Sequence, residues 1–178
     1  MEKIQFEEIY IERIDKESDE VIANETSSFL DKSITFLKDK SHVNEYVFLD
    51  IDVFSKIGID GLSIEMDDLF HTYSVMFGLP AQKKKETVIK AFFQNKLRSD
   101  EPKFAAMFNQ TDGVWDINLN LDYLEGYKED LSFQEALILI YDLLNELLSS
   151  MKEGWSKMNI KSFEIEKIKD PTGILVGD

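Results

Sequence analysis

The chain has 178 residues, of which 35 are acidic and 20 are basic, giving a formal net charge of −15. A charge this negative repels phosphate backbones and anionic lipid headgroups, which argues against direct binding to nucleic acid or to a membrane surface. The absence of cysteine excludes disulfides and thiolate metal sites. The length fits one domain, which we place at residues 1–168, and residues 169–178 are predicted to form a flexible tail.

The start of the chain favours the cytoplasm. Residues 1–8 mix charged and apolar side chains, whereas a secretory signal has a basic start followed by an uninterrupted apolar run. No stretch approaches the length of a membrane-spanning apolar segment. The sequence also lacks a Gly-x-Gly-x-x-Gly motif, a phosphate-binding loop and a Gly-x-Ser-x-Gly elbow, so we expect neither a bound cofactor nor a metal.

The N-terminal third reads as helix. Ile11, Ile14, Val21 and Ile22 recur at roughly helical spacing, and the series continues to Phe29 and Leu30. Ser18, followed by two acidic residues, is a plausible helix start. Ser33 is expected to cap a second, short helix that runs through residues 36–37.

The next segment predicts a strand, a hairpin and a helix. Residues 46–54 alternate between an apolar row and a row that contains Asp50 and Asp52. Asp60-Gly61 is a dipeptide favoured in two-residue hairpin turns, and a second strand should follow it. A helix is then expected from Asp67 or Asp68 to residue 77, ended by Gly78.

A further helix, a strand pair and a long helix follow. Residues 81–97 carry a helical apolar stripe, and residues 114–123 alternate as a strand that pairs with 104–108 across a turn-rich connection. Ser132 and Glu135 form a capping box before a helix over 132–152. That helix is apolar on most sides, which favours central burial or a homodimer through it. Residues 163–168 are expected to form a terminal strand.

These elements predict an α+β fold, with a mainly antiparallel sheet packed with N-terminal, central and C-terminal helices. Runs of helices and runs of strands, in place of strict alternation, are typical of that class.

One candidate site pools the polar rows of two strands. If the strands at 46–54 and 114–123 share a sheet, their polar side chains can lie on one face. Carboxylate and amide oxygens suit a hard cation, and they equally suit lysines and arginines of a partner protein. The candidate residues are Asp50, Asp52, Asp116, Asn118, Asn120 and Asp122.

Other residues suggest metal or anion chemistry. The segment 47–53, an apolar strand that ends in Asp50-x-Asp52, resembles the first motif of haloacid-dehalogenase-type phosphatases, although Val53-Phe54 stands where that family has Gly-Thr. The resemblance implies Asp50 as nucleophile and Asp52 as acid and base. His71 follows Asp67 and Asp68 at helical spacing, which would suit a metal-binding pair. The lysines at 83–85 are the only dense basic spot.

Four segments resemble a group of small acidic proteins from Bacillus-type bacteria: residues 25–30, 76–79, 112–118 and 122–127. The resemblance extends over most of the chain, and some of these proteins carry the label branched-chain amino acid aminotransferase. Aminotransferases of that kind hold pyridoxal phosphate on a lysine and are much longer. No lysine here stands in a matching context, so no catalytic residue is carried over.

Together these features favour a non-enzymatic cytoplasmic interaction protein, of the immunity or antitoxin kind, that binds a basic partner through an acidic face. A metal-dependent enzyme acting on a small molecule or phosphate ester, with Asp50 and Asp52 at its site, is one alternative. A homo-oligomeric structural domain is the other.

Overall fold

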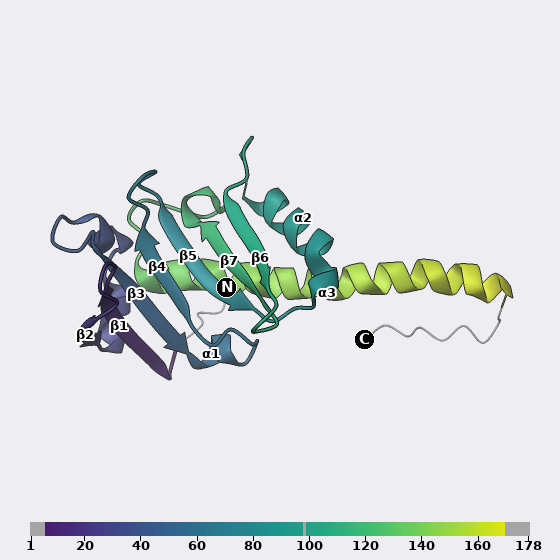
Figure 1. Ribbon diagram of the computed structural model, residues 1–178, viewed down its shortest axis with the longest axis horizontal. Coiled ribbons are helices and arrows are strands. Elements are labelled where there is room, and N and C mark those ends of the chain that lie inside the picture. Colours follow the sequence, from purple (N-terminus) through teal and green to yellow (C-terminus); the bar gives the residue numbers. More distant parts are fainter. Residues whose placement is uncertain (1–5, 98, 170–178) are drawn as a thin grey trace.

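The computed structural model describes residues 6–97 and 99–169, with the side chains of the last helix described as far as Lys152. Seven strands form one antiparallel sheet in the order β2-β1-β3-β4-β5-β7-β6 (Figure 1). The strands are β1 (Ile9–Asp15), β2 (Val21–Glu25), β3 (Glu45–Ile51), β4 (Leu62–Met66), β5 (Tyr73–Leu79), β6 (Phe104–Asn109) and β7 (Val114–Asn120). The predicted α+β class with an antiparallel sheet is therefore confirmed.

Three α-helices and four short 3-10 segments accompany the sheet in the described residues. The helices are α1 (Asp52–Ser55), α2 (Glu86–Lys96) and α3 (Phe133–Lys169). The 3-10 segments are η1 (Ser27–Asp31), η2 (Ile34–Lys38), η3 (Lys83–Lys85) and η4 (Leu121–Tyr123). Among the described residues, no helix combines the length and the apolar character that crossing a bilayer requires.

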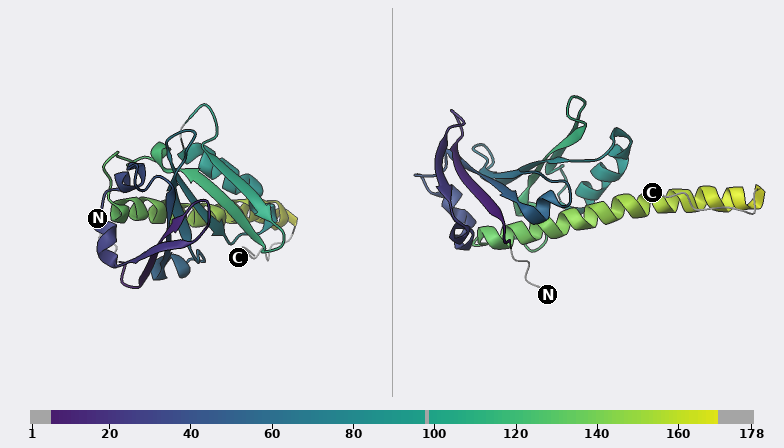
Figure 2. Two further views of the ribbon diagram at one scale, coloured as in Figure 1. Left: turned by 60° about the vertical axis from the view of Figure 1, so that its left-hand side comes forward. Right: turned by 90° about the horizontal axis from the view of Figure 1, so that it is seen from below.

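The core lies between one face of the sheet and α3. Alternate strand residues such as Leu49, Ile64 and Val75 point to this side and are buried. Figure 1 shows α3 passing behind the strands, and Figure 2 shows it running along that side of the sheet. Leu137 and Leu144 of α3 are fully buried there. We call this side of the sheet the inner face.

Helix α2 extends the cover of the inner face at the β6 end. Its Phe93 ring lies 5.5 Å from the ring of Phe104 on β6. The indole N–H of Trp115, an inner-face residue of β7, donates to the carbonyl of Gln82 at 3.2 Å, just before η3. The central and C-terminal helices thus share one side of the sheet.

The predicted N-terminal helix is wrong, because residues 9–25 form the β1–β2 hairpin. The Asp15 carboxylate accepts the N–H groups of Glu17 at 2.9 Å and Ser18 at 3.0 Å, and Asp19 has a positive φ of 57°, so the chain reverses where Ser18 was expected to begin a helix. Ile11 and Ile14 lie on opposite faces of β1, yet both are buried, which imitates helical spacing.

The short helix capped by Ser33 exists as the 3-10 segment η2. The Ser33 side chain accepts a hydrogen bond from the Thr35 N–H at 3.2 Å. Leu37 is buried in this segment, whereas Phe36 is half-buried. In the N-terminal region the described helical turns are therefore η1 and η2.

The predicted helix over 67–77 is also wrong, because Tyr73–Leu79 is strand β5. The Asp67 carboxylate accepts the N–H groups of Leu69 and Phe70, each at 2.8 Å, and His71 has a positive φ of 55°. These bonds form the turn between β4 and β5. Gly78 lies inside β5 and is not a helix stop.

Two strands end earlier than predicted. β3 ends at Ile51, and the chain enters α1 at Asp52, so Asp52 leaves the polar row of the strand. β7 ends at Asn120, and residues 121–123 form η4. The predicted hairpin turn at Asp60-Gly61 is wrong. The connection from β3 to β4 contains α1 instead, and Gly58, with φ +90°, follows that helix before β4 begins.

The β6–β7 hairpin and the start of α3 are confirmed. β6 pairs with β7 in register from Phe104–Leu119 to Asn109–Val114. The capping box has both bonds, since Glu135 N–H donates to Ser132 Oγ at 3.0 Å and Ser132 N–H to Glu135 Oε1 at 3.2 Å. α3 continues to Lys169, so the predicted strand at 163–168 is wrong. Of the predicted tail, residues 170–178 lie outside the described residues.

Candidate functional site

The face of the sheet opposite α3 is covered by neither α2 nor α3, and Figure 1 looks onto it. We call it the open face. By strand register its residues are Tyr10, Glu12 and Ile14 of β1, Val21 and Asn24 of β2, Tyr46, Phe48 and Asp50 of β3, Ser63 and Glu65 of β4, Ser74, Met76 and Gly78 of β5, Ala105, Met107 and Asn109 of β6, and Val114, Asp116, Asn118 and Asn120 of β7.

The open face carries carboxylates without cations. Its acidic residues are Glu12, Asp50, Glu65 and Asp116, and none of these strand positions holds a lysine or arginine. Among the described residues Glu12, Asp50 and Asp116 form no ion pair, and only Glu65 lies near a cation, 3.9 Å from Lys16 Nζ. The face therefore presents uncompensated negative charge.

The negative charge is reflected in the pKa values of neighbouring groups. A hydrogen bond to Glu12 raises the pKa of Tyr10 above its ordinary value. Burial raises the pKa of Glu65; Lys16 opposes this shift, whereas the negative charges of Asp68 and Asp67 add to it. A cation that approached this surface would relieve that repulsion.

Aromatic and thioether side chains lie between the carboxylates. Tyr10 is 49% exposed and Met107 is 72% exposed, while Tyr46, Phe48 and Met76 are half-buried. Rings beside carboxylates suit lysine and arginine, because the ring face attracts the cation and the carboxylate accepts its hydrogen bonds. The chemistry of the open face is thus that of binding cationic side chains.

A shallow hollow of about 440 Å³ lies on the open face across β5, β7 and β6. Met76, Ala105 and Met107 give it apolar walls, and Asp116 and Asn118 stand at its side. An apolar hollow with an adjacent carboxylate fits the aliphatic stem and charged head of a lysine or arginine side chain.

The strands that carry Asp50 and Asp116 share a sheet, which is the condition that the pooled site required. Asp50 lies beside Tyr10, and Asp116 lies between Gly78 and Met107. β4 and β5 separate the two aspartates, so they are three strand spacings, about 14 Å, apart. This separation suits an extended contact and excludes a single shared cation.

The other predicted residues divide between the open face and elsewhere. Asn118 is exposed on the open face. Asn120 lies at its end, with an Oδ1 atom that is buried and accepts no hydrogen bond. Asp122 lies in η4, where its Oδ1 accepts the Tyr73 N–H at 2.7 Å. Burial, together with Asp122, raises the pKa of Tyr127 to about 12. Asp122 therefore has a structural role, because it links η4 to the start of β5.

Asp52 borders a second hollow, beside α1. Asp50, Asp52 and Glu8 line it together with Ser55, whose hydroxyl donates to Asp50 Oδ1 at 3.4 Å. Asp52 starts α1 directly, with no loop that could wrap a phosphate group. In the described residues, no group of three or more His, Cys, Asp or Glu is placed to hold a metal ion.

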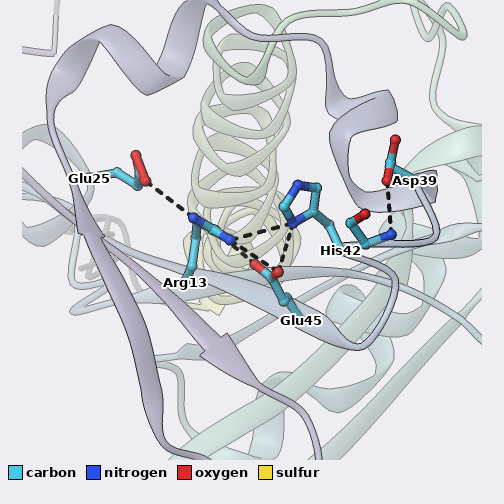
Figure 3. A network of polar contacts seen from close by, with 6 residues as sticks. Arg13, Glu25, Asp39, His42 and Glu45 are labelled. Atoms are coloured by element: carbon cyan, nitrogen blue, oxygen red, sulfur yellow. Dashed lines mark hydrogen bonds and ion pairs between the residues drawn. The ribbon is translucent and has the colours of Figure 1, made fainter.

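The two histidines lie apart from each other. His71 is exposed in the β4–β5 turn, so the predicted helical set with Asp67 and Asp68 is not formed. His42 Nδ1 lies 2.7 Å from Glu45 Oε2, in the network of Figure 3. The lysines at 83–85 form η3 at the start of α2.

The network around Glu45 contains a buried carboxylate that is paired with a cation, unlike the carboxylates of the open face. Glu45 is buried, and Arg13 donates two hydrogen bonds to it, from Nε to Oε1 at 2.7 Å and from Nη2 to Oε2 at 3.1 Å (Figure 3). Burial raises the pKa of Glu45, but the hydrogen bonds from Arg13 and His42 outweigh it and bring the pKa below its ordinary value. The His42 ring stacks on Phe36, with centroids 3.9 Å apart.

Several open-face residues were not predicted, among them Glu12, Glu65 and Tyr10. The signal was present for β1, since Ile9 and Ile11 alternate with Tyr10 and Glu12. Reading residues 9–15 as a strand would have placed Tyr10 and Glu12 together on one face.

No family model, no curated protein and no solved structure matches this chain. The resemblance to small acidic proteins of Bacillus-type bacteria stays a prediction, and the site rests on the geometry of the open face.

Proposed function

We propose that this chain is a non-enzymatic, cytoplasmic protein-interaction module whose open face binds a basic protein. The relation would be that of an immunity or antitoxin protein to a cationic nuclease. One observation carries the proposal: the outward positions of all seven strands hold four carboxylates and no lysine or arginine. Three of them, Glu12, Asp50 and Asp116, form no ion pair among the described residues and so keep their attraction for an incoming cation.

The surface also has the composition of a protein interface. Exposed Tyr10 and Met107 and half-buried Tyr46 and Phe48 supply apolar contact area between the charges. Aromatic side chains and methionine are enriched at such surfaces, and the hollow at Met76 and Met107 can take an anchoring side chain. Charge would speed association, and the apolar residues would supply most of the binding energy.

A charge-reversal variant tests the proposal. Glu12→Lys/Asp50→Lys/Asp116→Lys reverses three unpaired carboxylates of the open face. Glu101→Lys/Glu129→Lys/Asp130→Lys is the matched control, because it has the same net charge and changes exposed residues elsewhere. Each protein is immobilised and exposed at low salt to extract of the source cells, and bound proteins are identified. Affinities of the purified partner are then measured over a range of salt concentrations.

We expect wild type and control to bind the same basic protein and the open-face variant to lose at least about tenfold in affinity, or about 1.4 kcal/mol. Binding should weaken as salt rises, because screening shortens the reach of surface charges to about 10 Å at 0.1 M. An equal loss in both variants would show that net charge alone matters and would refute the open face as the site. Absence of any specific basic partner would refute the proposal.

A further inference from the structure

The edge strand β2 has an unpaired side. Among the described residues β2 is the first strand of the sheet and pairs with β1 alone. Two hydrogen bonds just beyond the ends of β1 run to the β3 side: Lys16 N–H donates to the Asn44 carbonyl, and Asp52 N–H donates to the Glu8 carbonyl. Lys16 and Glu8 are both even-numbered, so the even-numbered residues of β1 bond toward β3. The odd-numbered residues bond toward β2, opposite Ala23 and Glu25. The backbone N–H and C=O of Asn24 therefore point away from the sheet, into solvent.

The side chains of this edge favour strand pairing. Val21 is 50% exposed and Ile22 is 47% exposed, and both are β-branched residues that prefer extended backbone. The described part of β2 contains no proline and no lysine, two residues that commonly block sheet edges. The pairing of β2 with β1 is irregular between Val21 and Ala23, so the regular part of this edge lies at residues 23–25. An extended segment of another chain can add to β2 there.

The charge of the edge selects what can add. Residues 17–31 contain Glu17, Asp19, Glu20, Glu25 and Asp31 and no lysine or arginine. Glu25 lies 3.4 Å from Arg13 Nη1, so the attraction for a cationic segment comes from the other four. A second copy of this chain would bring the same acidic edge against this one and would be repelled. A cationic segment would be attracted, and its side chains beside Asn24 could reach toward Glu12, which is paired with Asn24 on β1.

The opposite edge of the sheet lacks this selectivity. β6 carries no charged residue between Phe104 and Asn109. The residues that flank β6 mix charges, with Asp100, Glu101 and Asp112 beside Lys103, so this edge attracts a cationic segment less strongly than β2 does. β2 is thus the edge at which exposed backbone, exposed β-branched side chains and negative charge coincide.

We propose that β2 is a docking strand, and that an extended, lysine- or arginine-rich segment of the partner adds to it as an eighth strand. This inference rests on the proposed function and names its mode of recognition. Main-chain hydrogen bonds to Asn24 set the register of the added segment, and the acidic residues of 17–31 together with Glu12 select its cationic side chains. The open face then continues onto the added strand.

The test uses a defined probe, a seven-residue peptide with blocked ends in which lysine and valine alternate and lysine stands at both ends, so that the central residue is valine. Its control has the central residue replaced by proline, which keeps the charge and removes the ability to form a continuous strand. Binding to the full chain is followed at low salt by amide-resolved nuclear magnetic resonance. We expect the amide of Asn24 to shift and to exchange more slowly with solvent, with the alternating peptide only.

Two substitutions at one position separate backbone from side-chain effects. Asn24→Pro removes the outward N–H while leaving the bonds of Ala23 and Glu25 to β1, and Asn24→Ala keeps that N–H. We expect Asn24→Pro to weaken peptide binding by about tenfold or more and Asn24→Ala to leave it unchanged. Melting temperature reports whether Asn24→Pro retains the fold; if it does not, N-methylation of alternate residues of the probe replaces that variant.

Each outcome decides between the surfaces. Equal binding of the two peptides, or binding lost in Glu12→Lys/Asp50→Lys/Asp116→Lys but kept in Asn24→Pro, would overturn the docking strand and leave the open face as the site. Absence of peptide binding would also overturn it, while the proposed function is judged on the natural partner. A dimer of the free protein that Asn24→Pro dissolves would make a second copy the occupant and would refute a cationic segment.

Discussion

The two faces of the sheet are built from the same strands but differ in how their charged and apolar side chains are covered. On the inner face Met66 and its neighbours are buried, and Glu45, the buried carboxylate among the described residues, is bound by Arg13. On the open face, Asp50 and Asp116 stand without a cation, and Met107 is exposed. The inner face is complete within the chain, whereas the open face leaves both charge and apolar surface unsatisfied. We therefore assign stability to the inner face and, as proposed above, recognition to the open face.

The largest expected contrast comes from one substitution made on each face. Met66→Ala removes a side chain that is 2% exposed and leaves a cavity in the core, so we expect the free energy of unfolding to fall by about 2–5 kcal/mol. Met107→Ala removes a side chain that is 72% exposed, and we expect a change within about 0.5 kcal/mol. Urea unfolding measures both. Similar losses in the two variants would mean that the open face is covered in solution.

The next contrast concerns the two kinds of carboxylate. Glu45→Gln leaves Arg13 facing a neutral amide, and we expect a loss of about 1.5–3 kcal/mol at neutral pH. Because the folded-state pKa of Glu45 is depressed, its contribution is present above the ordinary glutamate pKa of 4.5 and is lost as pH falls through the folded value. Wild type should therefore lose more stability than Glu45→Gln between neutral and acid pH. Parallel pH profiles would contradict this assignment.

A smaller effect is expected at the start of the helix that covers the inner face. Ser132→Ala removes the hydroxyl that accepts the Glu135 N–H and should cost about 1 kcal/mol. Ser149→Ala, at an exposed position inside the same helix, is the control and should be neutral or slightly stabilising. Thermal unfolding compares the two. Equal effects would mean that the capping box contributes nothing in solution.

The smallest effect on stability is expected on the open face. Asp116→Lys changes an exposed residue that forms no described ion pair, so the free energy of unfolding should stay within about 0.5 kcal/mol of wild type. Relief of repulsion in so acidic a chain favours a slight gain. Denaturant unfolding at low and high salt measures it. A loss beyond about 1 kcal/mol would show that Asp116 has a structural partner, and would remove it from the recognition surface.

The sequence predicts best where local pattern and tertiary structure agree. The alternation of residues 114–120, the turn-rich 109–113 and the Ser132–Glu135 capping box all act within a few residues, and all three are found. The apolar breadth of the 132–152 helix is also explained within the chain, because α3 meets the sheet on one side and α2 and η1 on others. The apolar surface of the helix therefore does not by itself call for a second subunit, and the homodimer through that helix stays a prediction.

The sequence misleads where a side chain redirects the backbone. Asp15 and Asp67 each accept two backbone N–H groups and turn the chain, so strands stand where helical spacing was read. The predicted candidate site is affected in the same way, because Asp52 and Asp122 were placed at the ends of strands but lie in α1 and η4. Asp50, Asp116 and Asn118 reach the open face as predicted, but Glu12 and Glu65 depend on pairings that no single segment reveals.

The position of α3 in the chain has a consequence for synthesis. α3 follows every strand that it covers, so the ribosome makes the whole sheet before the helix that buries its inner face. Until residues 133–151 emerge, side chains such as Leu49, Ile64 and Val75 have no cover from that helix. A nascent chain in this state exposes an adhesive apolar surface and unpaired strand edges, the features that chaperones recognise. Emergence of α3, and not the pairing of the strands, is then the step that covers this apolar surface.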